Sequence, residues 1–151
     1  MALEVLRHHR LLELYLHDKL NLPWDQVHDE AERLEHAISD ELAERMAAAL
    51  GNPGVDPHGD PIPTADGVIA EVVGMPLSEV PAGTEVEVLR VNEHEPGRLR
   101  YLAELGLVPG AAVAVLERQP FDGPITIRTE AGERSLGSRM ARDILCAGVP
   151  E

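Results

Sequence analysis

Apolar residues in the first fifty positions recur at the spacing of one helix face, and this region contains no glycine. Such a period predicts a first α-helix over residues 2–17. Its apolar positions are Leu3, Leu6, Leu11, Leu14 and Tyr15.

A second helix is predicted to begin after Leu22 and to run to about Ala37. Pro23 suits the first turn of a helix, because proline lacks an N–H and that group would be unpaired there anyway. Asp25 follows, where a carboxylate is favoured by the positive end of the helix dipole.

A third helix is predicted over residues 40–50, with Ser39 as its N-cap and Gly51 as the glycine that ends it. Residues 51–63 are rich in proline and glycine and close the helical region. Three helices of this length are too few to bury all their leucines within one chain, so we expect this region to form a homodimer.

From Met75 onward the pattern changes to short runs separated by turns. Residues 84–91 alternate apolar and charged side chains, as a half-buried strand does. The further predicted elements are a short helix over 98–105 and strands over 112–117, 124–129 and 133–136. We therefore predict an α+β protein with a helical domain at 1–63, a linker at 64–74 and a small β-barrel at 75–151.

Composition excludes several classes of protein. The 151 residues include 27 acidic and 13 basic side chains, a net charge of −14, and 3% aromatics, so the chain is not expected to bind nucleic acid by itself. The single cysteine excludes an internal disulfide framework and an all-thiolate metal site. The sequence contains neither a membrane-spanning apolar run nor a signal peptide, so a cytoplasmic protein is expected.

Histidines and carboxylates recur at helical spacing within residues 28–36. Four side chains lie at i, i+4, i+7 and i+8 and share one predicted helix face: His28, Glu32, Glu35 and His36. His9 and Glu13 form another i, i+4 pair on the preceding helix. Imidazole and carboxylate groups from two packed helices suit a first-row divalent metal. A solvated acidic helix face has the same pattern, so spacing alone leaves both interpretations open.

Three segments, 9–13, 27–40 and 57–63, resemble the dimerisation and metal-binding region of the diphtheria toxin repressor family. These proteins are iron- and manganese-dependent bacterial transcription regulators. Residues 80–83, 102–110, 123–127 and 140–144 are similar to the SH3-like domain of such regulators, which also occurs alone in ferrous-iron transport accessory proteins. The resemblance covers nearly the whole chain and implies a three-helix dimerisation and metal-binding layer followed by an SH3-like barrel.

The resemblance also implies metal ligands. The ancillary site of the family matches His9, Glu13 and His28, and its primary, activating site matches Glu32, Glu35 and His36. In the SH3-like domain Glu93 is the candidate for an additional ligand, with Glu95 as the alternative. Pro96 stands at the position of a second, glutamine ligand, and His94 is the candidate to replace it.

The function implied is the metal-sensing and dimerisation part of a manganese- or iron-dependent transcriptional repressor. Family members begin with a winged helix-turn-helix that reads operator DNA and gives the primary site one more ligand. This sequence begins at the dimerisation helices, so operator DNA is expected to be bound only through that missing segment. A metal-transport accessory protein is the alternative. An enzyme is not expected, because di-metal oxidases place Glu-x-x-His pairs on two helices.

The residue at position 32 predicts the metal. Iron-responsive members of the family have a cysteine at the matching position, whereas manganese-responsive members resemble this chain in having a glutamate. Carboxylate is a hard ligand that suits Mn²⁺, while thiolate favours softer ions. We expect Mn²⁺ to be preferred, Fe²⁺ to be the second physiological candidate, and Zn²⁺, Co²⁺, Ni²⁺ and Cd²⁺ to substitute in vitro.

Overall fold

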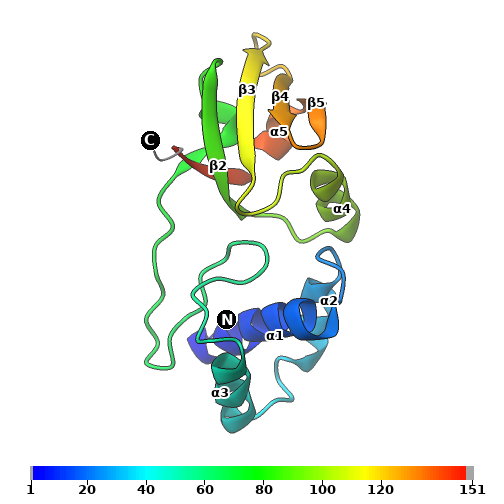
Figure 1. Cartoon of the computed structure of the whole chain (residues 1–151). Helices are drawn as coiled ribbons and strands as arrows, with labels where there is room; N and C mark the ends of the chain where they lie inside the picture. The colour runs from blue at the N-terminus through cyan, green and yellow to red at the C-terminus, as the bar shows by residue number, and fades with distance from the viewer. Residues whose placement is uncertain (1, 149–151) are drawn as a thin grey trace. The chain divides into compact units, whose positions relative to one another are not determined.

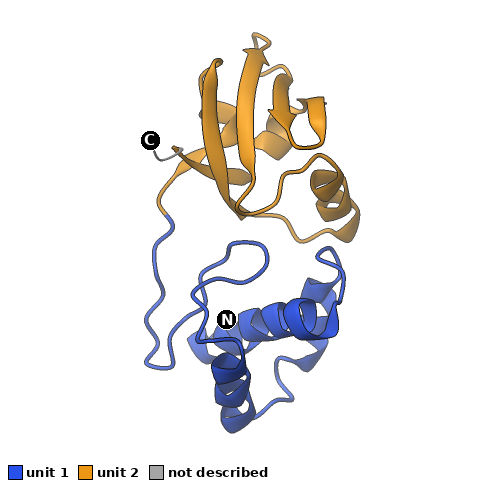
Figure 2. Ribbon diagram, in the orientation of Figure 1, with its two compact units in different colours: residues 1–72 blue, residues 73–151 orange. Residues whose placement is uncertain are grey.

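The computed structural model describes residues 2–148. The chain divides into two compact units, with the division between Val72 and Val73 (Figure 2). Unit 1 is helical and unit 2 contains the β-strands (Figure 1). The α+β class predicted from the sequence is therefore confirmed.

Three helices form unit 1: α1 (Leu3–Leu20), α2 (Val27–Leu34) and α3 (Asp40–Ala49). Helix α1 runs three residues past its predicted end, to Leu20, and Asn21 caps it in the left-handed conformation with a φ of 57°. Helix α3 begins as predicted, because the Ser39 hydroxyl accepts the N–H of Leu42.

Helix α2 is shorter than predicted at both ends. Its start is delayed because Pro23–Gln26 form a turn, in which the Gln26 N–H donates to the Pro23 carbonyl oxygen. It ends at Leu34, and residues 35–37 form a turn instead of a further helical turn. The prediction of a helix to Ala37 is wrong, and the four polar residues expected on one face are not all on the helix.

The helices of unit 1 enclose a small apolar core. The fully or nearly buried residues Leu11, Ala43 and Ala47 pack with Ile62, which lies in the segment that follows α3. This segment folds back on itself through an isolated bridge between Val55 and Pro61. The 51–63 segment is therefore held against α1 and α3 and belongs to the folded unit.

Unit 2 contains a six-stranded antiparallel sheet with the order β1-β6-β2-β3-β4-β5. Its strands are β1 (Met75–Pro76), β2 (Thr84–Val91), β3 (Ala112–Arg118), β4 (Ile125–Thr129), β5 (Gly132–Leu136) and β6 (Ile144–Gly148). Strand β2 has the predicted bounds, and its alternation buries Val86, Val88 and Val91. Irregular register in the β2–β6 and β3–β4 pairs marks two β-bulges, which bend a sheet.

Short helices accompany the sheet. Helix α4 (Pro96–Glu104) begins two residues before its predicted start, because Glu95 accepts the N–H groups of Gly97 and Arg98. Helix α5 (Ser138–Ala141) and the 3₁₀ turn η1 (Leu77–Glu79) were not expected from the pattern. Across the described residues, no helix combines the length and apolar character that crossing a bilayer requires.

Candidate metal centre

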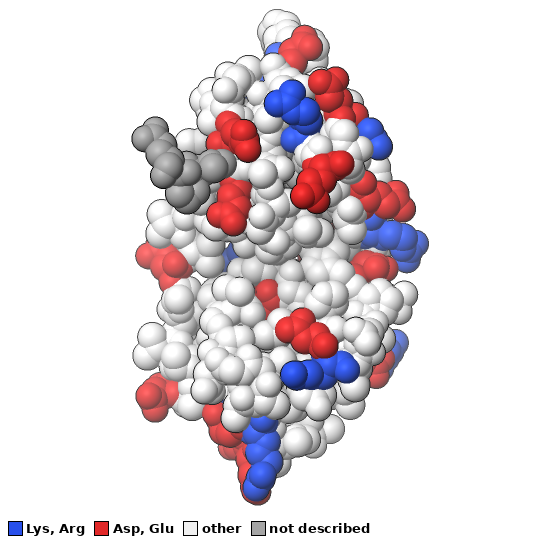
Figure 3. Space-filling model, viewed as in Figure 1, with Lys and Arg blue, Asp and Glu red and all other residues white. Residues whose placement is uncertain are grey.

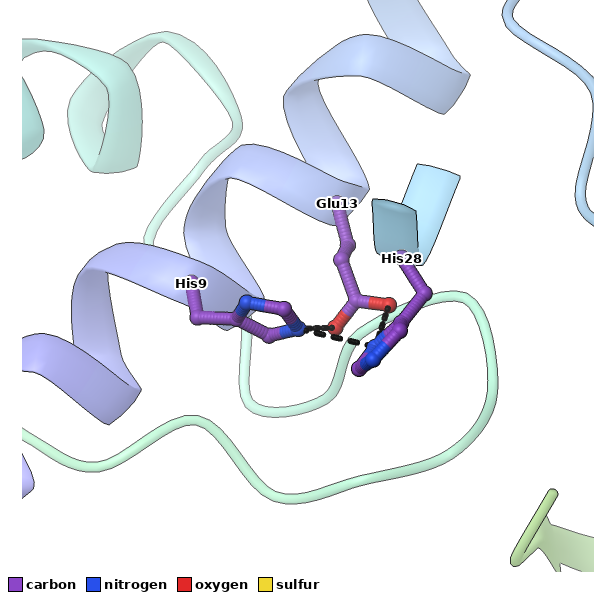
Figure 4. Close-up of side chains that lie close together, drawn as sticks. All are labelled: His9, Glu13 and His28. Carbon is purple, nitrogen blue, oxygen red and sulfur yellow. Dashed lines mark hydrogen bonds and ion pairs between the residues drawn. The ribbon is translucent and has the colours of Figure 1, made fainter. Parts of the chain in front are cut away.

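A cluster of histidines and carboxylates lies where α1 faces α2 (Figure 4). His9 and Glu13 are one turn apart on α1, with His9 Nε2 3.2 Å from Glu13 Oε1. His28 enters from the first turn of α2, and its Nδ1 lies 3.1 Å from His9 Nε2. Ligand atoms of these three residues all lie within 4.8 Å of one another. The structure therefore brings together the first predicted set of ligands.

The Glu13 carboxylate is buried, with 1% of its surface exposed. Burial by itself raises the pKa of this carboxyl, but contacts with His58, His9 and Asp56 outweigh it and hold the pKa well below its ordinary value. Glu13 is therefore ionised at neutral pH inside the protein. A buried anion of this kind requires compensating positive charge.

Two residues that the sequence analysis did not select, Asp56 and His58, complete the surroundings of Glu13. Both lie in the 51–63 segment, and both are buried. One oxygen of Asp56, Oδ1, accepts the backbone N–H groups of His58 and Asp60. His58 Nε2 lies 2.9 Å from the Trp24 carbonyl oxygen, which can only accept, so this nitrogen carries a proton. The segment thus fixes both the position and the tautomer of His58.

Three buried atoms around Glu13 have no hydrogen-bond partner: Glu13 Oε2, Asp56 Oδ2 and His58 Nδ1. Ligand atoms of these residues also lie within 4.8 Å of one another. His58 Nδ1 is 3.2 Å from Glu13 Oε2 but is not aligned for a hydrogen bond. The Nδ1 atom of His58 therefore lies beside the carboxylates of Glu13 and Asp56. Two carboxylates and an imidazole that lie together without partners form a donor set that a divalent cation accepts.

The pKa of Asp56 lies well above its ordinary value. Burial is the largest cause, and the nearby carboxylates of Glu13 and Asp60 add to it. In the absence of a cation, Asp56 therefore retains a proton more readily than an exposed aspartate. This preference is the expected response of a carboxylate group that lies beside another one in an apolar interior.

The second predicted set, Glu32, Glu35 and His36, is not gathered around one point in the part of the chain that the structure describes. Glu35 is buried and its Oε2 lies 2.6 Å from His9 Nδ1. Glu32 and His36 are exposed. Glu32 Oε2 is 3.6 Å from His28 Nε2, and His36 Nε2 is 3.5 Å from Glu35 Oε1. The early end of α2 separates these residues, because Glu35 and His36 follow the last helical residue.

Glu93, the ligand expected from the SH3-like domain, uses its oxygens within unit 2. Its Oε1 accepts the N–H groups of His94 and Glu95, and its Oε2 lies 3.5 Å from Arg98. Glu95, the alternative, caps α4 with both of its carboxylate oxygens. In this structure both carboxylates therefore support the local fold of the loop before α4.

Asp56 and His58 were not predicted as ligands, because a proline- and glycine-rich segment has no periodicity to interpret. A signal was present, since Asp56, His58 and Asp60 alternate with prolines and glycine in this segment. Titratable residues at alternate positions of such a loop are unusual for a simple solvated turn, where burial is not expected. Their burial is the observation that gives them a role.

Comparisons with known proteins agree with this architecture. Residues 1–64 match the family model described as "Iron dependent repressor, metal binding and dimerisation domain", and residues 75–147 match the FeoA domain. The chain is 32% identical to the diphtheria toxin repressor of Corynebacterium diphtheriae, over 95% of this chain and 67% of that protein. It is 38% identical to the iron-dependent repressor IdeR of Mycobacterium tuberculosis, over 82% of this chain and 58% of that protein.

The similarity extends to solved structures. A manganese-dependent transcriptional repressor in complex with manganese is 42% identical, with a TM-score of 0.91 over 97% of this chain and 70% of that chain. The manganese regulator SloR is 31% identical, with a TM-score of 0.83 over 97% of this chain and 68% of that chain. The protein belongs to the diphtheria toxin repressor family of metal-dependent transcriptional repressors. It spans 58% of the length of the mycobacterial relatives.

Proposed function

We propose that this chain is the metal-sensing and dimerisation part of a manganese- or iron-dependent transcriptional repressor. One observation carries the proposal: three buried side-chain atoms, on Glu13, Asp56 and His58, lie together without a hydrogen-bond partner. Each unsatisfied buried polar group costs about 1–3 kcal/mol. A fold that maintains three of them at one point is expected to recover this cost by binding a cation. The manganese-dependent repressors of similar structure support the same assignment.

The ligands that we assign with most support are His9, Glu13 and His28, with Asp56 and His58 completing the surroundings of Glu13. All are imidazole or carboxylate donors, and none is a thiolate. Such donors suit Mn²⁺ and Fe²⁺, and they also accept Zn²⁺, Co²⁺, Ni²⁺ and Cd²⁺. Two related repressor structures contain Cd²⁺ and Zn²⁺, which supports substitution in vitro. Glu32, Glu35 and His36 stay a proposed second set, and Glu93 a further proposed ligand.

The proposed work is a binding linkage and not a catalysed reaction. A cation held by α1, α2 and the 51–63 segment stabilises one arrangement of these elements. Binding therefore shifts the population toward that arrangement in proportion to its differential affinity. The transport-accessory alternative accounts only for the FeoA match of unit 2. It gives the buried ionisable groups of unit 1 no role.

We further propose that the working form is a cytoplasmic homodimer that binds operator DNA through a winged helix-turn-helix preceding these helices. The face shown in Figure 3 has acidic side chains scattered over it, and its basic side chains form no continuous patch. With a net charge of −14, this 151-residue chain by itself is expected not to bind duplex DNA at physiological salt. Sequence-specific DNA binding by this chain in a gel-shift experiment would contradict the proposal that DNA is bound through the preceding segment.

Calorimetric titration with Mn²⁺ tests the metal assignment. Glu13→Gln keeps the shape of the side chain and removes the buried charge, so the affinity for Mn²⁺ is expected to fall at least about tenfold. Glu41→Gln is the matched control, because Glu41 is exposed and forms an ion pair with Arg45 on the same helix. Equal Mn²⁺ affinities in the wild type and in Glu13→Gln would remove Glu13 from the proposed centre.

The metal preference is tested at Glu32. Replacing this carboxylate by a thiolate, in Glu32→Cys, is expected to shift the preference from Mn²⁺ toward Zn²⁺, because thiolate is the softer ligand. The measurement is the ratio of the two affinities by competition titration. An unchanged ratio would mean that Glu32 is not a selectivity ligand, and the comparison is repeated in a protein that includes the DNA-binding segment.

A further inference from the structure

A second mixed cluster in unit 1 shares no residue with the proposed metal centre. Glu4 and His8 lie one turn apart on α1, and Asp40 is the first residue of α3. His8 Nε2 is 3.1 Å from Asp40 Oδ1. One ligand atom from each of the three residues lies within 4.8 Å of the other two. The cluster therefore joins the beginning of α1 to the beginning of α3.

The three side chains differ in exposure in a way that suits a ligand from solvent. His8 is 6% exposed, so its ring is fixed in the protein interior while its Nε2 is directed at the cluster. Glu4 and Asp40 are exposed and reach the same point from the solvent side. The cluster thus combines one rigid nitrogen donor with two accessible carboxylates, a donor set that first-row divalent cations accept.

The carboxylates of Glu4 and Asp40 lie close enough to repel each other. The hydrogen bond and the charge of Asp40 raise the pKa of the Glu4 carboxyl above its ordinary value. Two adjacent carboxylates are relieved either by sharing a proton or by a cation between them. At neutral pH a bound cation offsets the repulsion between the two carboxylates without requiring that either one is protonated.

The surroundings favour positive charge as well. The cluster borders a cavity of about 480 Å³, which Glu44 and Asp66 also line. Arg7 is the cation in this lining, but its guanidinium is engaged elsewhere: it donates to both carboxylate oxygens of Glu44 and to the carbonyl oxygen of Pro63. The charge of Arg7 is therefore neutralised locally and does not compensate Glu4 and Asp40.

We propose that Glu4, His8 and Asp40 form a second binding site for a first-row divalent cation. A cation held there links α1 to α3, so it stabilises the helical unit without occupying the centre formed by His9, Glu13 and His28. Zn²⁺ is the sharpest probe, because a nitrogen donor with two carboxylates binds it more tightly than Mn²⁺ in the Irving–Williams order.

The test uses the whole 151-residue chain and the double variant Glu4→Gln/Asp40→Asn. Both residues are exposed and both replacements keep the side-chain shape, so the fold is expected to persist, which circular dichroism verifies. Zinc bound per chain is measured by competition with a chromogenic chelator. The double variant is expected to bind one equivalent fewer than the wild type. Asp18→Asn/Glu41→Gln removes the same charge from exposed positions of α1 and α3 and is expected to keep that equivalent.

A second readout observes the site directly. Zinc is expected to shift the ¹⁵N resonance of His8 Nε2 in the wild type and in the control variant, but not in Glu4→Gln/Asp40→Asn. Equal zinc stoichiometry in all three proteins, or a His8 resonance that zinc does not move in the wild type, would overturn the proposal. A loss of Mn²⁺ binding in Glu13→Gln is a separate result, because Glu13 does not belong to this cluster. The two proposals therefore fail independently.

Discussion

The interiors of the two units differ in kind. Among the described residues, every buried polar or charged side chain lies in unit 1: His8, His9, Glu13, Glu35, Asp56, His58 and Asp60. The buried side chains of unit 2 are apolar, apart from the thiol of Cys146. Burial of apolar surface stabilises the sheet without further help. In the helical unit, by contrast, ionisable groups lie in the interior, where desolvation penalises their charged forms. The difference favours a ligand-binding role for unit 1 and a structural role for unit 2.

The largest expected effect concerns the apolar interior of unit 2. Ile127, on β4, is fully buried. Ile127→Ala leaves a cavity and is expected to lower the free energy of unfolding of unit 2 by about 2–5 kcal/mol. The loss is expected to be the same with Mn²⁺ and with chelator. Denaturant titration under both conditions measures it, and Val73→Ala, at a position that is 77% exposed, is the control with an expected change within about 0.5 kcal/mol.

Metal addition is expected to act on the other unit. At a Mn²⁺ concentration one hundred times the dissociation constant, binding stabilises the folded state by about 2.7 kcal/mol. Amide hydrogen exchange, followed by mass spectrometry, is expected to show slower exchange in α1, α2 and residues 51–63 and no change in β2–β4. Equal protection of both units would contradict the comparison, since the proposed ligands with most support all lie in unit 1.

Replacing one of the three buried groups without a partner is expected to separate stability from binding. Asp56→Asn retains an oxygen for the N–H groups of His58 and Asp60 and replaces the second oxygen by a donor that faces Glu13. The unit without metal is expected to gain about 0.5–1.5 kcal/mol, the value of one hydrogen bond. Its affinity for Mn²⁺ is expected to fall about 10–100-fold. Thermal unfolding and calorimetry measure the two effects, and a loss of stability in the metal-free variant would contradict the arrangement.

The smallest expected effect is the pH dependence of the metal-free protein. Burial lowers the pKa of His9, but Glu13 and Glu35 raise it more, so the net shift is upward. The stabilisation from protonated His9 is therefore complete below about pH 6.5, the ordinary pKa of histidine, and is lost as the pH rises through its pKa in the folded state. The raised pKa of Asp56 acts in the same direction.

Unit 2 supplies the internal reference for this measurement. Burial raises the pKa of the Cys146 thiol from 9.0 to about 12, so this group affects stability only when the pH exceeds about 9. Hydrogen exchange between pH 6 and pH 8, corrected for the intrinsic rate, is expected to show weaker protection of unit 1 at the higher pH and constant protection of unit 2. His9→Gln is expected to reduce the dependence in unit 1. A change confined to unit 2 would contradict the assignment.

Elements whose ends are set by neighbouring residues were predicted well. Ser39 places the start of α3, and the alternation of residues 84–91 gives both ends of β2. The end of α2 was predicted incorrectly, because the polar pattern continues through Glu35 and His36 whereas the backbone turns at residue 35. Helix α5 has four residues, too few to establish a period.

The candidate centre was predicted in part for a similar reason. Helical spacing is local information and places His9 beside Glu13 on one helix, and the resemblance to the family adds His28 to this pair. Asp56 and His58 reach Glu13 only because the 51–63 segment folds back onto α1, more than forty positions earlier in the chain. Contacts of this kind depend on tertiary packing, and the sequence pattern of a loop does not predict them.

The ring of His9 has one nitrogen directed at each predicted set of ligands. Its Nε2 faces Glu13 and His28, and its Nδ1 lies 2.6 Å from Glu35. A cation bound at Nε2 would leave the ring proton on Nδ1, within hydrogen-bond distance of Glu35. The single imidazole of His9 thus connects the two predicted sets of ligands, Glu13 and His28 through Nε2 and Glu35 through Nδ1.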